Sequence, residues 1–267
     1  MKASLASLVG ILAASPASAI IGGESVPAGK YPYIVSIYRP DLQATKHRAL
    51  NQCTGVLLSK NLVLTSSSCL QFNRKPLTKI ALNSTEKFLP RGDKMLFRMG
   101  RWSSPRNWRH IGQEYNIALI WFKGDHNITQ FARLPTRGQV PREGEVATAV
   151  GFGVMSFRGD KSDVLRELTL PITDTASCVE RFHDVMYVEG DKVCADACSE
   201  GRSSTCEGDS GGPVIVNDTV VGIISDGPLC RRGGCFPSVF TVVAEHLPFI
   251  ETGMLHPEPD RLVMEVE

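Results

Sequence analysis

The sequence predicts an all-β fold of the barrel type, and three observations support this class. First, 267 residues suit one or two domains, and all-β double barrels often fill this size. Second, many short segments alternate between apolar and polar residues or run apolar at strand length. Third, turns containing Gly, Pro and Asn separate these segments, which is typical of barrels. The hydrophobic fraction of 42% is ordinary for a globular protein.

The expected strands follow one another along most of the chain. They cover residues 31–37, 53–59, 62–66, 117–122, 146–151, 167–172, 213–216, 219–225 and 238–243. One helix is expected over residues 243–254, packing through Leu247 and Ile250, and Pro248 should weaken it locally. Residues 256–267 hold two prolines and four acidic residues, which predicts a flexible acidic tail.

Residues 1–19 are typical of a secretory signal peptide. Lys2 supplies the positive start, residues 5–14 form a short apolar run, and residues 17–19 form a small-residue cleavage site. The run is too short to span a bilayer, and no other apolar stretch reaches spanning length. We therefore expect a secreted, extracellular protein that begins at Ile20. The alternative is that signal peptidase cleaves one or two residues away from the bond between Ala19 and Ile20.

Residues 206–213, with the sequence CEGDSGGP, predict a nucleophile loop. Ser210 lies among glycines, which allow a sharp backbone turn and leave room for a substrate. The amides of Gly208 and Ser210 are expected to donate hydrogen bonds to a developing oxyanion. The string resembles the nucleophile loop of the chymotrypsin/trypsin-like serine proteases. Other segments similar to that family are residues 20–23, 31–37, 53–59, 63–69, 116–120, 150–153 and 237–241.

This resemblance implies a trypsin-like architecture for residues 20–255. It implies two six-stranded antiparallel Greek-key β-barrels, at about 20–135 and about 136–243, followed by the C-terminal helix. It also implies that the amine of Ile20 inserts beside Asp209 in the mature protein. A buried ion pair of this kind would hold the oxyanion loop in place, without a propeptide.

Two departures from the family pattern lie at the positions of the catalytic base and its carboxylate. Ser68 precedes Cys69 where the family has the histidine, and Asn116 begins the segment where the family has the aspartate. A serine hydroxyl is a poor nucleophile unless a neighbouring base takes its proton. Ser68 cannot act as that base near neutral pH, and Asn116 cannot stabilise a cation. We therefore predict that Ser210 is retained in a protein that is not a protease.

The alternative is that a base from elsewhere in the chain activates Ser210. The histidines are His47, His110, His126, His183, His246 and His256, and none stands in a base motif.

The resemblance also implies changes in the substrate groove. Asp226, followed by Gly227, replaces the tryptophan of the family's Ser-Trp-Gly segment. The base of the specificity pocket falls at Ser204, which would be neutral. Ser238 occupies a position on the pocket wall that is normally glycine, and would narrow the slot. Ordinary family variation is the alternative explanation for these changes.

Eight cysteines in a chain with a secretory signal imply disulfides, although sequence alone leaves their pairing open. The resemblance implies three pairs: Cys53–Cys69, Cys178–Cys194 and Cys206–Cys230. Cys198 and Cys235 remain, and a fourth bridge between them would stiffen the rim of the pocket. A zinc site is the competing interpretation, but no histidine accompanies these cysteines at ligand spacing. No metal or other cofactor is expected.

The sequence also contains three kinds of motif that are expected on the protein surface. Glycan acceptor motifs occur at Asn83, Asn127 and Asn217. Residues 91–93 match the adhesive tripeptide RGD, for which a solvated turn is the simpler interpretation. Residues 98–109 are basic and include two tryptophans, so they could hold a sulphated glycan. A variable surface loop, with tryptophan stacked under arginine, is the simpler interpretation here as well.

The sequence as a whole predicts a secreted, non-catalytic serine protease homologue. We expect it to act through binding of an extracellular protein, as decoy, cofactor or inhibitor in a protease or defence setting. The alternatives are a weak serine hydrolase using Ser210 and a module that binds anionic glycans or adheres to cells. A net charge of +1 gives no argument for nucleic-acid or membrane binding, and we expect a monomer.

Overall fold

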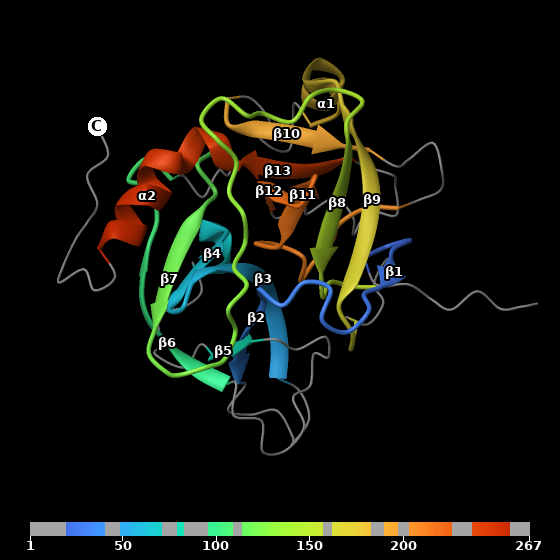
Figure 1. The fold of residues 1–267 in the computed structure, drawn as a ribbon. Helices are drawn as coiled ribbons and strands as arrows, with labels where there is room; N and C mark the ends of the chain where they lie inside the picture. Colours follow the sequence, from blue (N-terminus) through green and yellow to red (C-terminus); the bar gives the residue numbers. More distant parts are fainter. Residues whose placement is uncertain are drawn as a thin grey trace, which may run out of the picture.

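Two β-barrels lie side by side in the computed structural model (Figure 1). The structure describes residues 20–40, 49–70, 79–82, 96–108, 114–156, 162–182, 190–196, 203–225 and 237–256. The expected signal peptide and nearly all of the expected acidic tail lie outside these residues. Within them, no helix is both long and apolar enough to cross a membrane.

The first barrel is closed, with the strand order β2-β3-β4-β7-β6-β5. Its strands are β2 (Ile34–Pro40), β3 (Ala49–Ser59), β4 (Leu62–Thr65), β5 (Lys79–Leu82), β6 (Leu96–Ser103) and β7 (Ala118–Phe122). All neighbouring pairs are antiparallel. Alternating positions of these strands supply its core, which includes Val35, Leu57, Val63, Ile80 and Ile120.

The second barrel has the order β9-β10-β13-β12-β11-β8, and pairing of β8 with β9 closes the ring. Its strands are β8 (Val146–Gly151), β9 (Arg166–Thr173), β10 (Lys192–Ala195), β11 (Pro213–Val216), β12 (Thr219–Ile224) and β13 (Ser238–Val242). A short β1 (Glu24–Ser25) pairs with Arg166 and Glu167 at the start of β9. Both barrels therefore have six strands, which confirms the predicted fold class.

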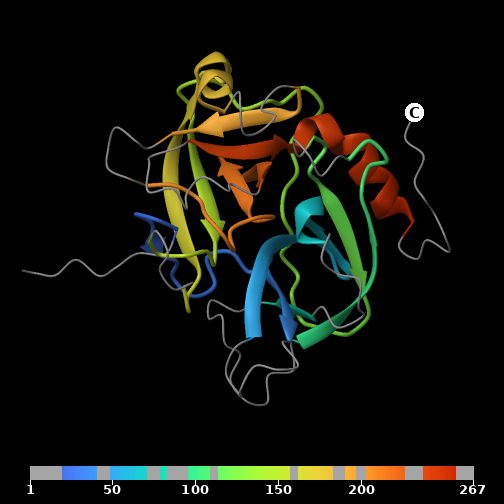
Figure 2. The ribbon, with the colours of Figure 1, turned by 180° about the vertical axis from the view of Figure 1, so that it is seen from behind.

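A shared core joins the two barrels. Ile34 and Leu64 of the first barrel belong to the same buried cluster as Val150 and Ile223 of the second. Helix α2 (Leu247–Leu255) leaves the second barrel and packs back onto β7 of the first (Figure 2). Gly253 of α2 lies so close to Leu119 of β7 that a Cβ on it would collide with the leucine side chain. The chain thus returns to its first half, which fixes the relative position of the barrels.

The C-terminal helix differs from its prediction. Residues 243–246 form the 3₁₀ turn η4 (Val243–His246), and α2 begins only at Leu247. Pro248 lies in the first turn of α2, where its missing N–H would have had no partner in any case. The expectation that Pro248 weakens the helix was therefore wrong, because this proline helps to begin it.

Several elements were missing from the prediction. These are β1, β5, β6, β10 and α1 (Thr175–Phe182). The strand expected to begin at residue 31 begins at Ile34, because residues 31–34 form a turn in which the amide of Ile34 donates to the carbonyl of Tyr31 (3.1 Å). Most other boundaries agree within one residue, but β3 begins at Ala49 rather than at 53.

Candidate functional site

The loop that carries Ser210 precedes β11 and is held against the first barrel. The amide of Thr54 donates to the carbonyl of Ser210 (2.8 Å), and the Thr54 hydroxyl donates to the carbonyl of Gly208 (3.1 Å). Gly211 has φ of +81°, and a Cβ there would collide with Thr65 and with the carbonyl of Thr54. Glycine is therefore required at this position, both for its conformation and for the close approach of the two barrels.

Gly208 also has a conformation that suits glycine, with φ of +102°. The amides of Asp209, Gly211 and Gly212 donate to the carbonyls of Cys206, Ile224 and Asp209. These bonds fix the backbone of the loop on both sides of Ser210. The oxyanion role of the Gly208 and Ser210 amides stays a prediction.

Ser68 and Asn116 lie together at the barrel interface. Ser68 belongs to the 3₁₀ turn η1 (Ser67–Cys69), which follows β4, and Asn116 precedes β7. The Oδ1 of Asn116 accepts the amide of Ser68 (2.9 Å), and its Nδ2 donates to the Ser68 hydroxyl (3.4 Å). Thr65 and the amide of Ser66 lie against Gly211, so this turn adjoins the Ser210 loop. The structure thus places all three predicted triad positions in one region.

A chain of polar contacts extends from Asn116 into the second barrel. The hydroxyl of Thr241 donates to the carbonyl of Asn116 (3.3 Å) and lies 3.1 Å from the hydroxyl of Ser225. The ammonium of Lys192 donates to the same Thr241 hydroxyl (2.9 Å) and pairs with Asp191 (3.0 Å). The Lys192 side chain is 0% exposed, so its charge depends on these contacts.

Asp191 connects Lys192 to His246, whose Nε2 lies 2.7 Å from the second carboxylate oxygen. Burial lowers the pKa of Lys192, and the charge of Asp191 offsets part of this effect. Burial acts to raise the pKa of Asp191, but the His246 hydrogen bond and the Lys192 charge outweigh it, so the net shift is downward. Asp191, Lys192 and His246 thus form a buried cluster in which opposite charges are paired, and Thr241 links this cluster to Asn116.

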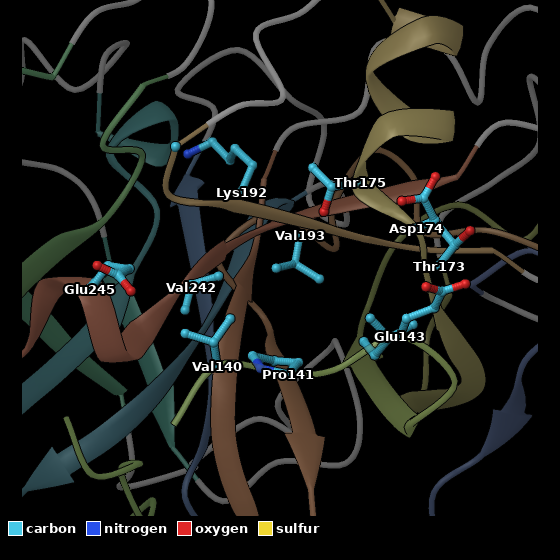
Figure 3. A pocket seen from close by; sticks show the side chains of 12 residues that line it. Val140, Pro141, Glu143, Thr173, Asp174, Thr175, Lys192, Val193, Val242 and Glu245 are labelled. Atoms are coloured by element: carbon cyan, nitrogen blue, oxygen red, sulfur yellow. The ribbon is translucent and has the colours of Figure 1, made fainter. Parts of the chain in front are cut away.

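One face of this cluster borders a cavity of about 310 Å³ on the second barrel (Figure 3). Lys192, Glu143, Asp174 and Glu245 contribute to its wall, whereas Ser68, Asn116 and Ser210 do not. Asp174 also caps α1 by accepting the amide of Ser177 (2.8 Å), and this bond is the main cause of its lowered pKa. The cavity is therefore separate from the candidate catalytic site.

Asp209 is fully buried. Its carboxylate accepts the amides of Gly153 (2.7 Å) and Cys206 (2.8 Å). A Cβ at Gly151 or at Gly153 would collide with this carboxylate, so both glycines make room for it. Ile20 is fully buried, and the amide of Ser204 donates to the carbonyl of Ile21 (3.1 Å). The pairing of the mature Ile20 amine with Asp209 remains a prediction.

The expected specificity pocket is described only in part. Ser204 and Ser238 are both buried, and the Ser238 hydroxyl accepts the amide of Thr205 (3.0 Å). The narrowing of the pocket by Ser238 stays a prediction. Asp226 and Gly227 lie outside the described residues.

A family model whose description is "Trypsin" matches residues 20–250, a range that includes both barrels and the Ser210 loop. The chain belongs to the trypsin family. A vitellin-degrading protease of Bombyx mori is 26% identical over 247 residues, which are 89% of this chain and 88% of that protein. Chymotrypsin-2 of Vespa crabro is 29% identical over 239 residues, which are 88% of this chain and all of that protein.

The trypsin fold is also found in a solved structure of human heparin binding protein. It is similar with a TM-score of 0.75 and 20% identity, and the match covers 91% of this chain and 100% of that chain. This likeness shows the fold.

Two of the disulfides expected from the trypsin family are present. They join Cys53 to Cys69 and Cys178 to Cys194. Cys206 is also disulfide-bonded. Cys198, Cys230 and Cys235 lie outside the described residues, so the proposed rim bridge stays a prediction.

The remaining predicted surface sites are described unevenly. Asn127 and Asn217 are exposed, whereas Asn83 and residues 91–93 lie outside the described residues. In the part of the chain that the structure describes, no group of three or more His, Cys, Asp or Glu side chains could hold a metal ion.

Sequence reasoning missed the polar groups that support the site. Thr54, which fixes the Ser210 loop, lies within a segment predicted only as a strand. Lys192 begins β10 and Asp191 directly precedes it, and this strand was not predicted. The sequence did contain one signal for the burial of Asp209, the pair Gly151 and Gly153. Two glycines that flank one residue in a strand can mark the close approach of another chain segment.

Proposed function

We propose that this member of the trypsin family is a secreted, non-catalytic protein that acts through binding. Its role would be that of a decoy, cofactor or inhibitor, and its partner an extracellular protein. The observation that carries this proposal is the hydrogen-bonded pair of Ser68 and Asn116. A hydroxyl and an amide occupy the places of a base and its carboxylate, and neither accepts a proton from Ser210 near neutral pH.

Of the histidines that the structure describes, two are hydrogen-bonded to groups other than Ser210, and the third lies at the end of α2. The Nδ1 of His126 accepts the amide of Ile128, and its Nε2 lies 2.6 Å from the carbonyl of Lys60. His246 pairs with Asp191, and His256 lies exposed at the end of α2. Removing the base from a Ser-His-Asp triad costs about 10⁶-fold in turnover, and an oxyanion hole leaves about 10³–10⁴-fold over water. These magnitudes support binding as the function.

The retained features of the site support the same proposal. The Ser210 loop keeps its glycines and its contacts with Thr54, so a rigid family-like surface persists without the base. We also expect Ser238 to narrow the specificity pocket, which would further disfavour proteolysis. A preformed surface loses less conformational freedom when it binds a partner.

Turnover of an activated ester and of a broad peptide library by the mature protein tests this function. Ser210→Ala is the matched control, and we expect wild type and control to be indistinguishable. Turnover that Ser210→Ala abolishes would instead establish the weak hydrolase. The same assay of His110→Ala would then show whether this histidine, outside the described residues, supplies the base.

A second candidate function, anionic-glycan binding, is favoured by one surface feature. Arg101 and Arg106 are exposed on or near β6, and Trp102 between them is 44% exposed. The similar human structure is named for heparin binding. If this segment binds sulphated glycans, Arg101→Ala with Arg106→Ala should lower the salt concentration that elutes the protein from heparin.

A further inference from the structure

A cleft of about 690 Å³ lies at the edge where the two barrels meet, away from Ser210. Its wall includes Tyr31, Tyr33, Phe131, Arg133, Asn217 and Asp218. Its volume is within the range of roughly 300–1,000 Å³ that is typical of ligand sites. The cleft plays no part in the proposed function described above.

The walls of the cleft are fixed by backbone hydrogen bonds. The amide of Leu57 donates to the carbonyl of Tyr33 (2.8 Å), and the amide of Ala132 donates to the carbonyl of Leu57 (2.9 Å). The amide of Val220 donates to the carbonyl of Arg133 (2.8 Å). The segment before β2, the segment 130–133 and the β11–β12 hairpin therefore form one preformed structure. Such a cleft can be filled with little cost in ordering.

The cleft combines aromatic surface with a polar rim. The rings of Tyr31 and Tyr33 lie 6.1 Å apart at an angle of 60°, and the Tyr31 hydroxyl donates to Glu167 (2.7 Å). Burial raises the pKa of Tyr33 to about 12, and the nearby charge of Asp218 adds to the shift. Asp218 lines the same cleft as both tyrosines, so the turn that bears it lies close to them. Tyrosine rings pack against the apolar faces of sugar rings, while polar neighbours bind sugar hydroxyls.

Asn217 is both a wall residue of the cleft and a glycan acceptor. It forms a two-residue turn with Asp218 between β11 and β12, with φ of 48° and 58°, as in a type I′ hairpin turn. Asn and Asp tolerate this left-handed conformation. Thr219 completes the acceptor motif, and Asn217 is exposed. A sugar on Asn217 would therefore begin at the rim of the cleft.

We propose that Asn217 carries an N-linked glycan whose first sugars lie in this cleft, against Tyr33 and Phe131. The proposal rests on the secretory route included in the proposed function. The Asn217 amide nitrogen would bond to the anomeric carbon of a lipid-pyrophosphate-linked oligosaccharide. The bond from that carbon to the pyrophosphate oxygen breaks, the lipid pyrophosphate leaves with the electron pair, and the amide loses one proton.

Attachment at the rim gives the glycan a high effective concentration in the cleft, so weak stacking suffices to hold it there. Asn127 offers a matched comparison within the same protein. It is an exposed acceptor and is not among the residues that line the cleft. A glycan on Asn127 should therefore extend into solvent.

The full chain secreted from cells that perform N-glycosylation provides the test. Peptide mapping should find a glycan on Asn217. Under native conditions, a peptide N-glycosidase should release it at least about tenfold more slowly than the glycan on Asn127, because a seated glycan must first leave the cleft. If Asn127 is unmodified, the reference is the release rate at Asn217 in the denatured protein. An unmodified Asn217, or a rate equal to the reference, would overturn the proposal.

A second variant separates seating in the cleft from ordinary crowding at the turn. Phe131→Ala removes aromatic surface without changing the acceptor, and the release rate at Asn217 should rise toward the reference rate. If this variant does not fold, enzymatic release of the glycan, which leaves Asp at the acceptor position, still separates the two cases. Release at Asn217 should lower Tm by about 2–4 °C, whereas release at Asn127 should change it by less than about 1 °C. Unchanged release in folded Phe131→Ala, or equal Tm shifts, would contradict the proposal. Neither result depends on whether Ser210 is reactive.

Discussion

At the residue scale, the arrangement of Ser68 and Asn116 explains why we expect Ser210 to be inert. Asn116 uses both ends of its side-chain amide on Ser68, accepting from its amide and donating to its hydroxyl. In a working triad, the corresponding carboxylate orients a histidine and stabilises its positive charge. Ser68 and Asn116 are still hydrogen-bonded to each other, as a histidine and its carboxylate would be. The hydroxyl, however, is not a base, and the side-chain amide carries no negative charge.

Restoring both side chains should therefore restore hydrolysis. Ser68→His with Asn116→Asp would rebuild the base and its carboxylate, and we expect hydrolysis of an activated ester to rise by about 10²-fold or more. Peptide cleavage should stay weak because we expect Ser238 to narrow the specificity pocket. Ser210→Ala in the same background is the control. No gain in a folded double mutant would mean that the oxyanion loop is also unable to support catalysis.

At the element scale, the buried cluster of Asp191, Lys192 and His246 ties β10 to β13 and to η4. The Lys192 ammonium reaches Thr241 of β13, and Asp191 reaches His246 of η4. A buried pair of this kind adds little net stability, but the loss of one partner leaves an uncompensated buried charge. The cluster thus makes the position of β10 sensitive to a single substitution.

Asp191→Asn should lower the free energy of unfolding by about 3–5 kcal/mol near pH 7. The folded-state pKa of Asp191 lies below its ordinary value, so its contribution is complete above about pH 4. The contribution is lost as the pH falls through the folded-state pKa, and the difference from wild type should shrink there. Urea unfolding at several pH values measures the difference in the free energy of unfolding.

The control is Glu251→Gln, which breaks an exposed pair with Arg137 and should lower the free energy of unfolding by no more than about 1 kcal/mol. Equal stability of Asp191→Asn and wild type at pH 7 would contradict the account.

The sequence predicted the elements whose patterns are local. Among the later strands, β7 to β9 and β11 to β13 have apolar runs or alternating patterns of ordinary length. The glycines of residues 206–213 likewise predict a tight loop from the sequence alone. β10 could not be predicted in the same way, because it begins at the charged Lys192 and only three apolar residues follow. Its burial depends on Asp191, Thr241 and His246, and Thr241 and His246 lie about fifty residues further along the chain. The division of the C-terminal segment into η4 and α2 likewise depends on tertiary packing.

At the scale of the whole molecule, the N-terminal segment connects maturation to the Ser210 loop. Ile20 is buried with φ of 47°, a conformation that β-branched residues rarely adopt. Cleavage after Ala19 would remove the carbonyl that makes this conformation strained. It would also create a charged amine close to the loop that carries Asp209.

We therefore expect mass analysis of the secreted protein to find Ile20 at its N-terminus. Asp209→Ala should then lower the free energy of unfolding by about 3 kcal/mol or more, because the buried amine would lose its partner. Asp209→Asn, which keeps an oxygen for the amides of Gly153 and Cys206, separates charge from hydrogen bonding. Secretion with several further residues upstream, or an unchanged stability of Asp209→Ala, would refute the insertion.

The central claim is that a trypsin scaffold here presents Ser210 without a base to activate it. Reaction of the mature wild-type protein with a fluorophosphonate, followed by intact mass and peptide mapping, tests this claim most directly. A serine without a base should not be modified over hours, whereas Ser68→His with Asn116→Asp should be modified at Ser210. Stoichiometric modification of Ser210 in the wild-type protein within minutes would contradict the claim.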